Sequence, residues 1–311
     1  MSGWRLVLRG RPRTVRCTYP MKTLAVVATL LAVARSAAAA PELLWETAGF
    51  VGPESVVLDA TRHEFYVSNM GTHGKDATPG DGFISRVSAE GKLLELKWVT
   101  GFDNPKGLAL VGGKLYVGDD KDLVEIDVAA GKVAQRYAPA DGPGDFNDVT
   151  ADAAGNVYVC SGRLGTIFRL HDGAFTAWYK LDRAKTGWLN GLKAEPDRLL
   201  LGGWSVRDAA DKEQLGHIST VAFADQALGR LGDQPICHID GLEPDGQGGY
   251  VVSDWLTGDV LHVSATGVPT PIMQLVRGTA DLTYLIASHQ LVIPSMNENV
   301  LRAYRWAPGE K

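Results

Sequence analysis

The stretch DGLEPDGQGGYVVSDW, residues 240–255, shows the pattern that decides the fold. It opens on an Asp-Gly pair and continues as a short alternating segment. It then turns at Asp-Gly-Gln-Gly-Gly and ends in the apolar run Tyr250-Val251-Val252 followed by SDW. Short apolar segments separated by Asp-Gly and Gly-Gly turns are typical of antiparallel β-strands. The carboxylate at the start of the segment needs a separate explanation.

The same layout recurs along the chain. Each copy has a polar first residue, a short alternating strand, a turn and an apolar strand, and a third strand and a hairpin turn usually follow. The copies are spaced by 52, 41, 43, 50 and 41 residues, and their first residues are Glu54, Lys106, Asn147, Asn190, Asp240 and Asp281. Repeats of this length with several strands each indicate a β-propeller.

We therefore expect an all-β fold, a six-bladed β-propeller with four-stranded blades. The segment PELLWETAG, residues 41–49, belongs to no repeat. As the outer strand of the last blade it would close the ring and cover its edges. An irregular β-sandwich is the alternative.

The first forty residues differ from the rest. Residues 1–20 are interpreted as an over-called start or a basic leader, with Met21 as the initiator. Residues 21–39 predict a secretory signal peptide, because Lys22 precedes an apolar run and a small-residue tail. A retained membrane anchor is the alternative, although the run is short for a span. Residues 40–311 would then be one propeller domain, periplasmic or secreted, with no membrane span after cleavage.

The charge of this domain narrows its partners. Beyond residue 40 the chain has 24 Lys and Arg residues against 36 Asp and Glu residues, a formal net charge of −12. An acidic domain without a basic stripe argues against nucleic-acid binding and is compatible with a cation site. Cys160 and Cys237 fall in different repeats, and we expect both to be unpaired.

In a propeller the innermost strand of each blade lines the central channel, so the six first residues are expected to converge at one mouth. Three carboxylates meeting there would repel one another and lose hydration, and Lys106 could neutralise only one of them. A divalent cation with oxygen ligands would offset this cost. Without His or Cys among the six, Zn²⁺ is disfavoured. Ca²⁺ is expected first, with Mg²⁺ or Mn²⁺ second and Zn²⁺ as the remaining alternative. Alternatively, these polar residues only bind water, and the Asp-Gly and Asn-Gly pairs only form turns.

The segments FNDVTAD (146–152), LNGLKAE (189–195) and the opening stretch resemble the senescence marker protein, gluconolactonase and luciferin-regenerating enzyme family of six-bladed propellers. The resemblance covers most of residues 50–305. It implies a divalent metal at the mouth, with Glu54, Asn190 and Asp240 as ligands. Asn147 matches a position that adds a ligand or contacts substrate, and Asp148 follows it. The chain departs from the family in placing Gly-Pro before its glutamate, and the long blade-one loop 71–82 could act as a lid.

The resemblance further implies metal-assisted hydrolysis of lactones or related esters, such as sugar acid derivatives. Asp240 would be the general base as well as a ligand, and Lys106 would bind a substrate carboxylate or assist the oxyanion. Lys106 and Asp281 match no family position. Together with Asn147 and Asp148 they are expected to contact the substrate.

Two other functions stay open. One is a non-catalytic propeller that binds a small ligand or a partner protein at the same mouth. The other is a protein-interaction propeller of the NHL type, against which the acidic charge weighs. Three tryptophans, Trp188, Trp204 and Trp255, flank strand ends near the mouth. Rim or core packing is their expected use, with carbohydrate stacking as the alternative.

Overall fold

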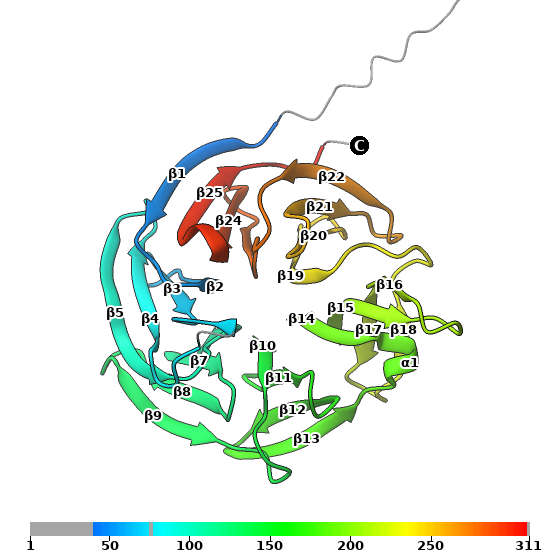
Figure 1. Cartoon of the computed structure of the whole chain (residues 1–311), viewed down its shortest axis with the longest axis horizontal. Helices are drawn as coiled ribbons and strands as arrows, with labels where there is room; N and C mark the ends of the chain where they lie inside the picture. Colours follow the sequence, from blue (N-terminus) through cyan, green and yellow to red (C-terminus); the bar gives the residue numbers. More distant parts are fainter. Residues whose placement is uncertain (1–39, 75–76, 310–311) are drawn as a thin grey trace, which may run out of the picture. The chain divides into compact units, whose positions relative to one another are not determined.

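The computed structural model describes residues 40–74 and 77–309, which form a ring of six antiparallel β-sheets around a central channel (Figure 1). The predicted six-bladed, all-β propeller is confirmed. The leader and the signal peptide predicted for residues 1–39 lie outside the described residues. We number the blades 1 to 6 in chain order.

Each blade begins at the channel and runs outward. The innermost strands are β2 (Pro53–Asp59), β6 (Leu108–Val111), β10 (Phe146–Ala151), β14 (Trp188–Ala194), β19 (Ile239–Pro244) and β23 (Thr283–Leu285). The second strands are β3 (Glu64–Asn69), β7 (Lys114–Gly118), β11 (Val157–Ser161), β15 (Arg198–Arg207), β20 (Tyr250–Asp254) and β24 (Gln290–Ser295).

The outer half of each blade completes the sheet. The third strands are β4 (Gly82–Ser88), β8 (Leu123–Asp127), β12 (Thr166–His171), β17 (Ile218–Ala222), β21 (Asp259–Val263) and β25 (Val300–Arg305). The outermost strands are β5 (Leu93–Phe102), β9 (Lys132–Tyr137), β13 (Ala174–Lys180), β18 (Leu228–Arg230), β22 (Pro269–Gln274) and β1 (Glu42–Ala48).

The ring closes as the sequence predicts. Strand β1, from the N-terminal end of the domain, pairs antiparallel with β25 in blade 6, from Glu42 opposite Arg305 to Ala48 opposite Val300. Blade 6 therefore takes its outermost strand from the opposite end of the domain (Figure 1). This pairing covers the edge of β25, which would otherwise present unpaired backbone groups.

The core is divided among the blades. Six clusters of buried apolar side chains lie one between each pair of neighbouring blades. Between blades 1 and 2, for example, Tyr66 and Ile84 pack with Leu115 and Ile126. These clusters explain why the second and third strands are nearly continuous apolar runs, since both of their faces are covered. Cys160 and Cys237 are free and buried in two of these clusters, as expected.

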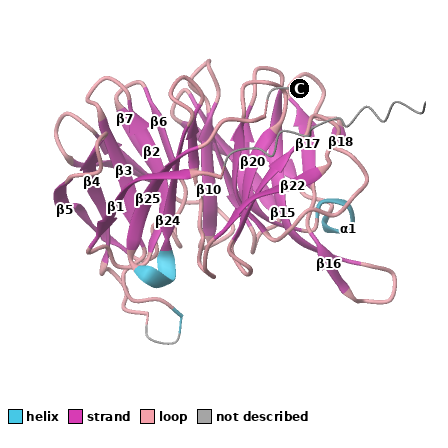
Figure 2. Cartoon of the chain, turned by 90° about the horizontal axis from the view of Figure 1, so that it is seen from above, coloured by secondary structure: helices cyan, strands magenta, loops and turns pink. Residues whose placement is uncertain are grey.

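Blade 4 departs from the common pattern. Its second strand, β15, has ten residues, whereas the other second strands have five or six. The extra length pairs with an additional strand, β16 (Glu213–Leu215). A one-turn helix, α1 (Arg183–Thr186), precedes β14. The β16 hairpin projects on the same side of the ring as the 3-10 helix η2 (Met296–Glu298) (Figure 2).

Candidate functional site

Five of the predicted site residues line one cavity, which we call the mouth cavity. Its volume is about 280 Å³. The five residues are Glu54, Lys106, Asn147, Asn190 and Asp240. They come from blades 1 to 5 in order, at the ends of the inner strands that the sequence pattern assigned to the channel. The predicted convergence of these five side chains is thus present in the structure.

A local irregularity accompanies these side chains. In β2 the ladder with β3 is interrupted at Glu54 and Ser55, so the inner strand carries one residue more than its partner. Register shifts also occur in three other inner strands, in β10 at Asn147 and Asp148, in β14 at Asn190, and in β19 at Asp240 and Gly241. Such β-bulges re-aim side chains and are frequent beside functional sites.

The glycines that follow the polar residues are explained by crowding at the axis. A Cβ atom on Gly191 would lie 2.6 Å from the carbonyl oxygen of Asp240, and one on Gly241 would lie 2.5 Å from the amide nitrogen of Leu282. Both glycines lie within inner strands. The Asn-Gly and Asp-Gly pairs are therefore not turns here, because the glycine lets neighbouring inner strands approach closely.

The two carboxylates of the mouth cavity are in a costly environment. Glu54 and Asp240 are both 4% exposed. Burial raises the pKa of Glu54 well above its ordinary value, and the charges of Asp240 and Asp281 raise it further. Burial likewise raises the pKa of Asp240, and the charges of Asp281 and Asp148 add to the effect. The charge of Lys106 lowers both pKa values, but both remain above their ordinary values.

One atom in this group lacks any partner. The Oε2 oxygen of Glu54 is buried and accepts no hydrogen bond from the described residues. Buried carboxylate oxygens without a partner are rare in folded proteins, because their desolvation is not compensated. On the far wall, the Nδ2 group of Asn147 donates to Oδ1 of Asn190. Carboxylate and amide oxygens thus face the same small space.

This donor set fits a hard divalent cation. Oxygen ligands from carboxylates and amides suit Ca²⁺, and the unpartnered Glu54 oxygen is where such an ion would compensate the buried charge. Within residues 40–74 and 77–309, no three His, Cys, Asp or Glu side chains are grouped so as to hold a metal ion. A cation here would therefore need Asn147 and Asn190 in addition to Glu54 and Asp240.

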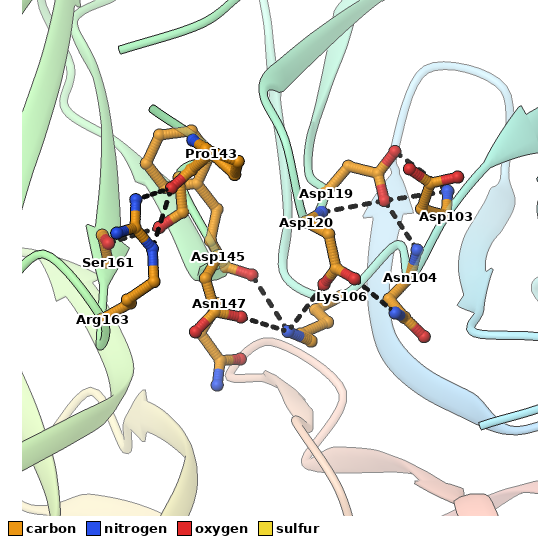
Figure 3. Close-up of polar contacts among 12 residues, drawn as sticks. Asp103, Asn104, Lys106, Asp119, Asp120, Pro143, Asp145, Asn147, Ser161 and Arg163 are labelled. Atoms are coloured by element: carbon orange, nitrogen blue, oxygen red, sulfur yellow. Dashed lines mark hydrogen bonds and ion pairs between the residues drawn. The ribbon is translucent and has the colours of Figure 1, made fainter. Parts of the chain in front are cut away.

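Lys106 is held at the rim of the cavity. Its Nζ donates to the carbonyl oxygen of Phe146 at 3.3 Å and lies 3.5 Å from Asp120 Oδ1 and 3.6 Å from Asp145 Oδ1 (Figure 3). Asp120 also accepts from Nδ2 of Asn104 at 2.5 Å. The ammonium group is thus fixed between blade 2 and the segment that enters blade 3. It forms its ion pairs with rim residues and not with Glu54 or Asp240.

Two predicted substrate contacts lie elsewhere. Asp148 and Asp281 line a different stretch of the channel, a cavity of about 160 Å³ that we call the channel cavity. Both Asp148 oxygens accept backbone N–H groups, from Val149 at 2.7 Å and from Leu192 at 2.5 Å. Asp281 accepts the hydroxyl of Ser55 at 2.6 Å. The structure does not bring these two carboxyl groups into the mouth cavity.

The alignment of blade 6 explains the position of Asp281. In other blades the residue just before the polar one pairs with the second strand, as Pro53 does with Asn69. In blade 6 the residue in that place is Thr279, which pairs with Ser295. Ala280 therefore occupies the position equivalent to Glu54, and Asp281 is equivalent to Ser55. Taking Asp281 as the first residue of its repeat was wrong by one residue.

Large apolar side chains surround the mouth cavity, and of these the sequence analysis placed Trp188, Trp204 and Trp255 near the mouth but missed Met70 and Met296. Four of them occupy equivalent positions in four blades. Each directly follows the second-strand residue that pairs with the position just before the site of Glu54 in its blade. The four are Met70, Trp204, Trp255 and Met296. The signal was present in the sequence, since these residues end the recurring segments YVSNM, LLLGGW, YVVSDW and LVIPSM. Trp188, at the start of β14, also lines the cavity.

The fold has solved counterparts. No protein-family model and no curated protein sequence matches the chain. A gluconolactonase from Xanthomonas campestris matches with a TM-score of 0.62 over 86% of this chain and 95% of its own, at 15% identity. The chain shares the fold of a gluconolactonase. The gluconolactonase-like ring also matches a virginiamycin B lyase from Staphylococcus aureus, with a TM-score of 0.57 over 84% of this chain and 98% of the lyase, at 11% identity.

The helices of residues 40–74 and 77–309 are too short and too polar for any of them to span a bilayer.

Proposed function

We propose that the chain is a divalent-metal-dependent hydrolase of lactones or related esters that acts at the mouth cavity. The observation that carries the proposal is the buried pair Glu54 and Asp240 beside two asparagine amides, with one Glu54 oxygen unpartnered. The gluconolactonase-like fold supports the choice of substrate class. The signal peptide expected in residues 21–39 makes the periplasm or the exterior the proposed location.

Four residues would hold the cation, namely Glu54, Asn147, Asn190 and Asp240. Ca²⁺ is the preferred ion, because all four side chains offer oxygen. When bound, the ion supplies a Lewis acid that polarises the substrate carbonyl. The apolar side chains of Met70, Met296 and the tryptophans line the cavity beside these groups.

Asp240 is the proposed general base. Its carboxylate accepts a proton from the attacking water as the new C–O bond forms to the carbonyl carbon. The ring C–O bond then breaks, and the leaving oxygen takes up the proton. Lys106, fixed at the rim by Asp120 and Asp145, would stabilise negative charge on the substrate.

A panel of chromogenic lactones and esters tests the proposal. We expect turnover that EDTA abolishes and Ca²⁺ restores, with one ¹⁸O atom from labelled water in the acid product. Ring opening without ¹⁸O uptake would indicate a lyase reaction, and the hydrolase proposal would be wrong. Ligand binding at the mouth cavity without turnover on any member of the panel would indicate the non-catalytic propeller.

A further inference from the structure

Blade 4 encloses a second cavity beside the mouth cavity. It lies between α1 and the β15–β16 hairpin, has a volume of about 630 Å³, and is called here the blade-4 cavity. Trp188 and Trp204 line both cavities, so the two spaces adjoin. Small-molecule sites typically measure about 300–1,000 Å³. The mouth cavity alone falls just below this range, whereas the blade-4 cavity lies well within it.

The departure of blade 4 from the repeat builds this space. The overlong β15 carries Trp204, Ser205 and Arg207 beyond the ring, and β16 pairs with that extension. On the other side α1 is anchored by Asp182, whose side chain accepts the amide of Ala184 at 3.2 Å. The two projections lie in the same blade, as Figures 1 and 2 show.

The lining combines aromatic rings with positive charge. The guanidinium carbon of Arg183 lies 4.7 Å from the ring centre of Trp188, and its NH2 group donates to the carbonyl oxygens of Gly162 and Arg163. Arg207, 63% exposed, pairs with Asp211 at 3.4 Å. Arg183, Arg207 and Glu213 are the charged side chains that line the cavity, and their formal charges sum to +1.

The two adjoining cavities therefore differ in charge. The mouth cavity is lined by Glu54 and Asp240 against Lys106, a formal charge of −1, and the acidic domain around it carries an excess of carboxylates. Tryptophan offers a large flat apolar surface, and a guanidinium matches a carboxylate with two parallel hydrogen bonds. A flat ring that bears a carboxylate satisfies both features of the blade-4 wall, whereas a polyhydroxy sugar lactone has neither an aromatic ring nor a charge.

We propose that the blade-4 cavity is a subsite for the non-reacting part of the substrate, and that this part is an aromatic ring carrying a carboxylate. The proposal rests on the proposed function, because it assigns the remainder of a molecule whose ester group lies in the mouth cavity. Trp188 and Trp204 contact the ring, and Arg183 and Arg207 receive the carboxylate.

Binding without turnover tests the subsite on its own. Calorimetric titration in EDTA would compare 2-naphthoate with 2-naphthylmethanol, which lacks the charge, and with gluconate, which lacks the ring. We expect 2-naphthoate to bind at least about tenfold more tightly than either, the size of one charge-assisted hydrogen bond. Naphthoate binding that is absent, or no tighter than gluconate binding, would overturn the proposal.

Matched variants locate the binding. Trp188→Ala and Arg207→Gln should each weaken 2-naphthoate by about tenfold. Arg305→Gln is the control, because Arg305 is 62% exposed and pairs with Glu42 at 3.2 Å, much as Arg207 pairs with Asp211. Unchanged thermal midpoints would show that the variants fold. If all three variants bind 2-naphthoate as tightly as the parent protein, the ligand binds elsewhere and the subsite proposal is wrong.

A catalytic comparison separates this inference from the proposed function. The Arg207→Gln variant should lower kcat/KM for phthalide-5-carboxylate, an aromatic lactone with a carboxylate, and spare δ-gluconolactone, because Arg207 lines the blade-4 cavity and not the mouth cavity. Metal-dependent turnover of both lactones with no effect of Arg207→Gln would overturn the subsite and leave the hydrolase standing. Naphthoate binding that depends on Trp188, without turnover of any lactone, would leave the subsite and reject the hydrolase.

Discussion

The mouth cavity and the channel cavity are both lined by acidic side chains, yet these side chains differ in their hydrogen-bond partners. In the channel cavity, Asp148 accepts two backbone amides and Asp281 accepts a serine hydroxyl. Glu243 in the same cavity pairs with Lys193 at 2.6 Å. In the mouth cavity, Glu54 Oε2 has no partner among the described residues. The partnered acids of the channel cavity tie inner strands together, whereas Glu54 keeps a buried oxygen that no described residue compensates.

The contrast between the two cavities distinguishes structural acids from candidate functional acids in the channel. Polar residues at the axis of a propeller are not informative by type alone, because Asp occurs in both cavities. Hydrogen bonds to neighbouring backbone mark Asp148 as a link between blades 3 and 4. Burial raises the pKa of Asp148 as well as that of Glu54, so the oxygen of Glu54 without a hydrogen bond from the described residues, and not the raised pKa, marks the mouth as the candidate functional region.

The largest effect is expected for Asp240→Asn in the mouth cavity. Loss of a general base costs about 10²–10⁴-fold in rate, whereas the amide keeps the shape of the side chain. Lactone turnover should therefore fall at least about 100-fold with no loss of thermal midpoint. The check is kcat on the best lactone of the panel beside a melting curve. Turnover that survives the substitution would remove Asp240 from its assigned role.

The channel cavity should respond in the opposite way. Asp148→Ala leaves the amides of Val149 and Leu192 without their acceptor, and an unsatisfied buried group costs about 1–3 kcal/mol. We expect the free energy of unfolding to drop by this amount, measured in urea, while the folded fraction keeps its lactone turnover. A stable but inactive Asp148→Ala protein would erase the distinction between the two cavities.

A smaller effect concerns pH in the metal-free protein. Burial raises the pKa of Glu54 in the folded state, so the folded chain holds a proton that the unfolded chain releases. Stability in EDTA should then fall as pH rises from about 4.3, the ordinary pKa of Glu, up through the raised pKa. The limit is about 1.4 kcal/mol per pH unit for one proton.

The Glu54→Gln variant sharpens this test. The amide does not titrate, so the pH dependence in EDTA should become shallower and the variant should be more stable than the parent at pH 8. Urea midpoints at pH 5, 6, 7 and 8 measure both. If stability depends on pH with the same slope in both proteins, Glu54 is not the acid whose raised pKa causes the pH dependence.

The sequence predicted the fold because the propeller signal is local. Alternating apolar residues and Asp-Gly or Gly-x turns recur in every blade, and the unassigned segment 41–49 had one place left to pair. The convergence of five mouth residues followed from equivalent positions in the repeat. The error at Asp281 has a simple cause, since blade 6 has the apolar Ala280 at the equivalent position and the first polar residue follows one place later.

Other features depend on tertiary contacts and had no local signal. Gly191 reads as a turn former in the sequence, yet it serves the approach of β14 to β19. The partners of Asp148 come from blade 4 as well as its own strand. The blade-4 cavity arises from two projections, α1 and the β15–β16 hairpin, that are separated in sequence by β14.

The central claim is that oxygen atoms from four blades gather at the mouth to bind one divalent cation. Calorimetric titration of EDTA-treated and dialysed protein with Ca²⁺ tests it most directly. We predict one site per chain, lost in Glu54→Gln and in Asp240→Asn and kept in Asp281→Asn, whose side chain lines the channel cavity. The absence of a Ca²⁺, Mg²⁺ or Mn²⁺ site, or a site that both mouth variants retain, would contradict the account.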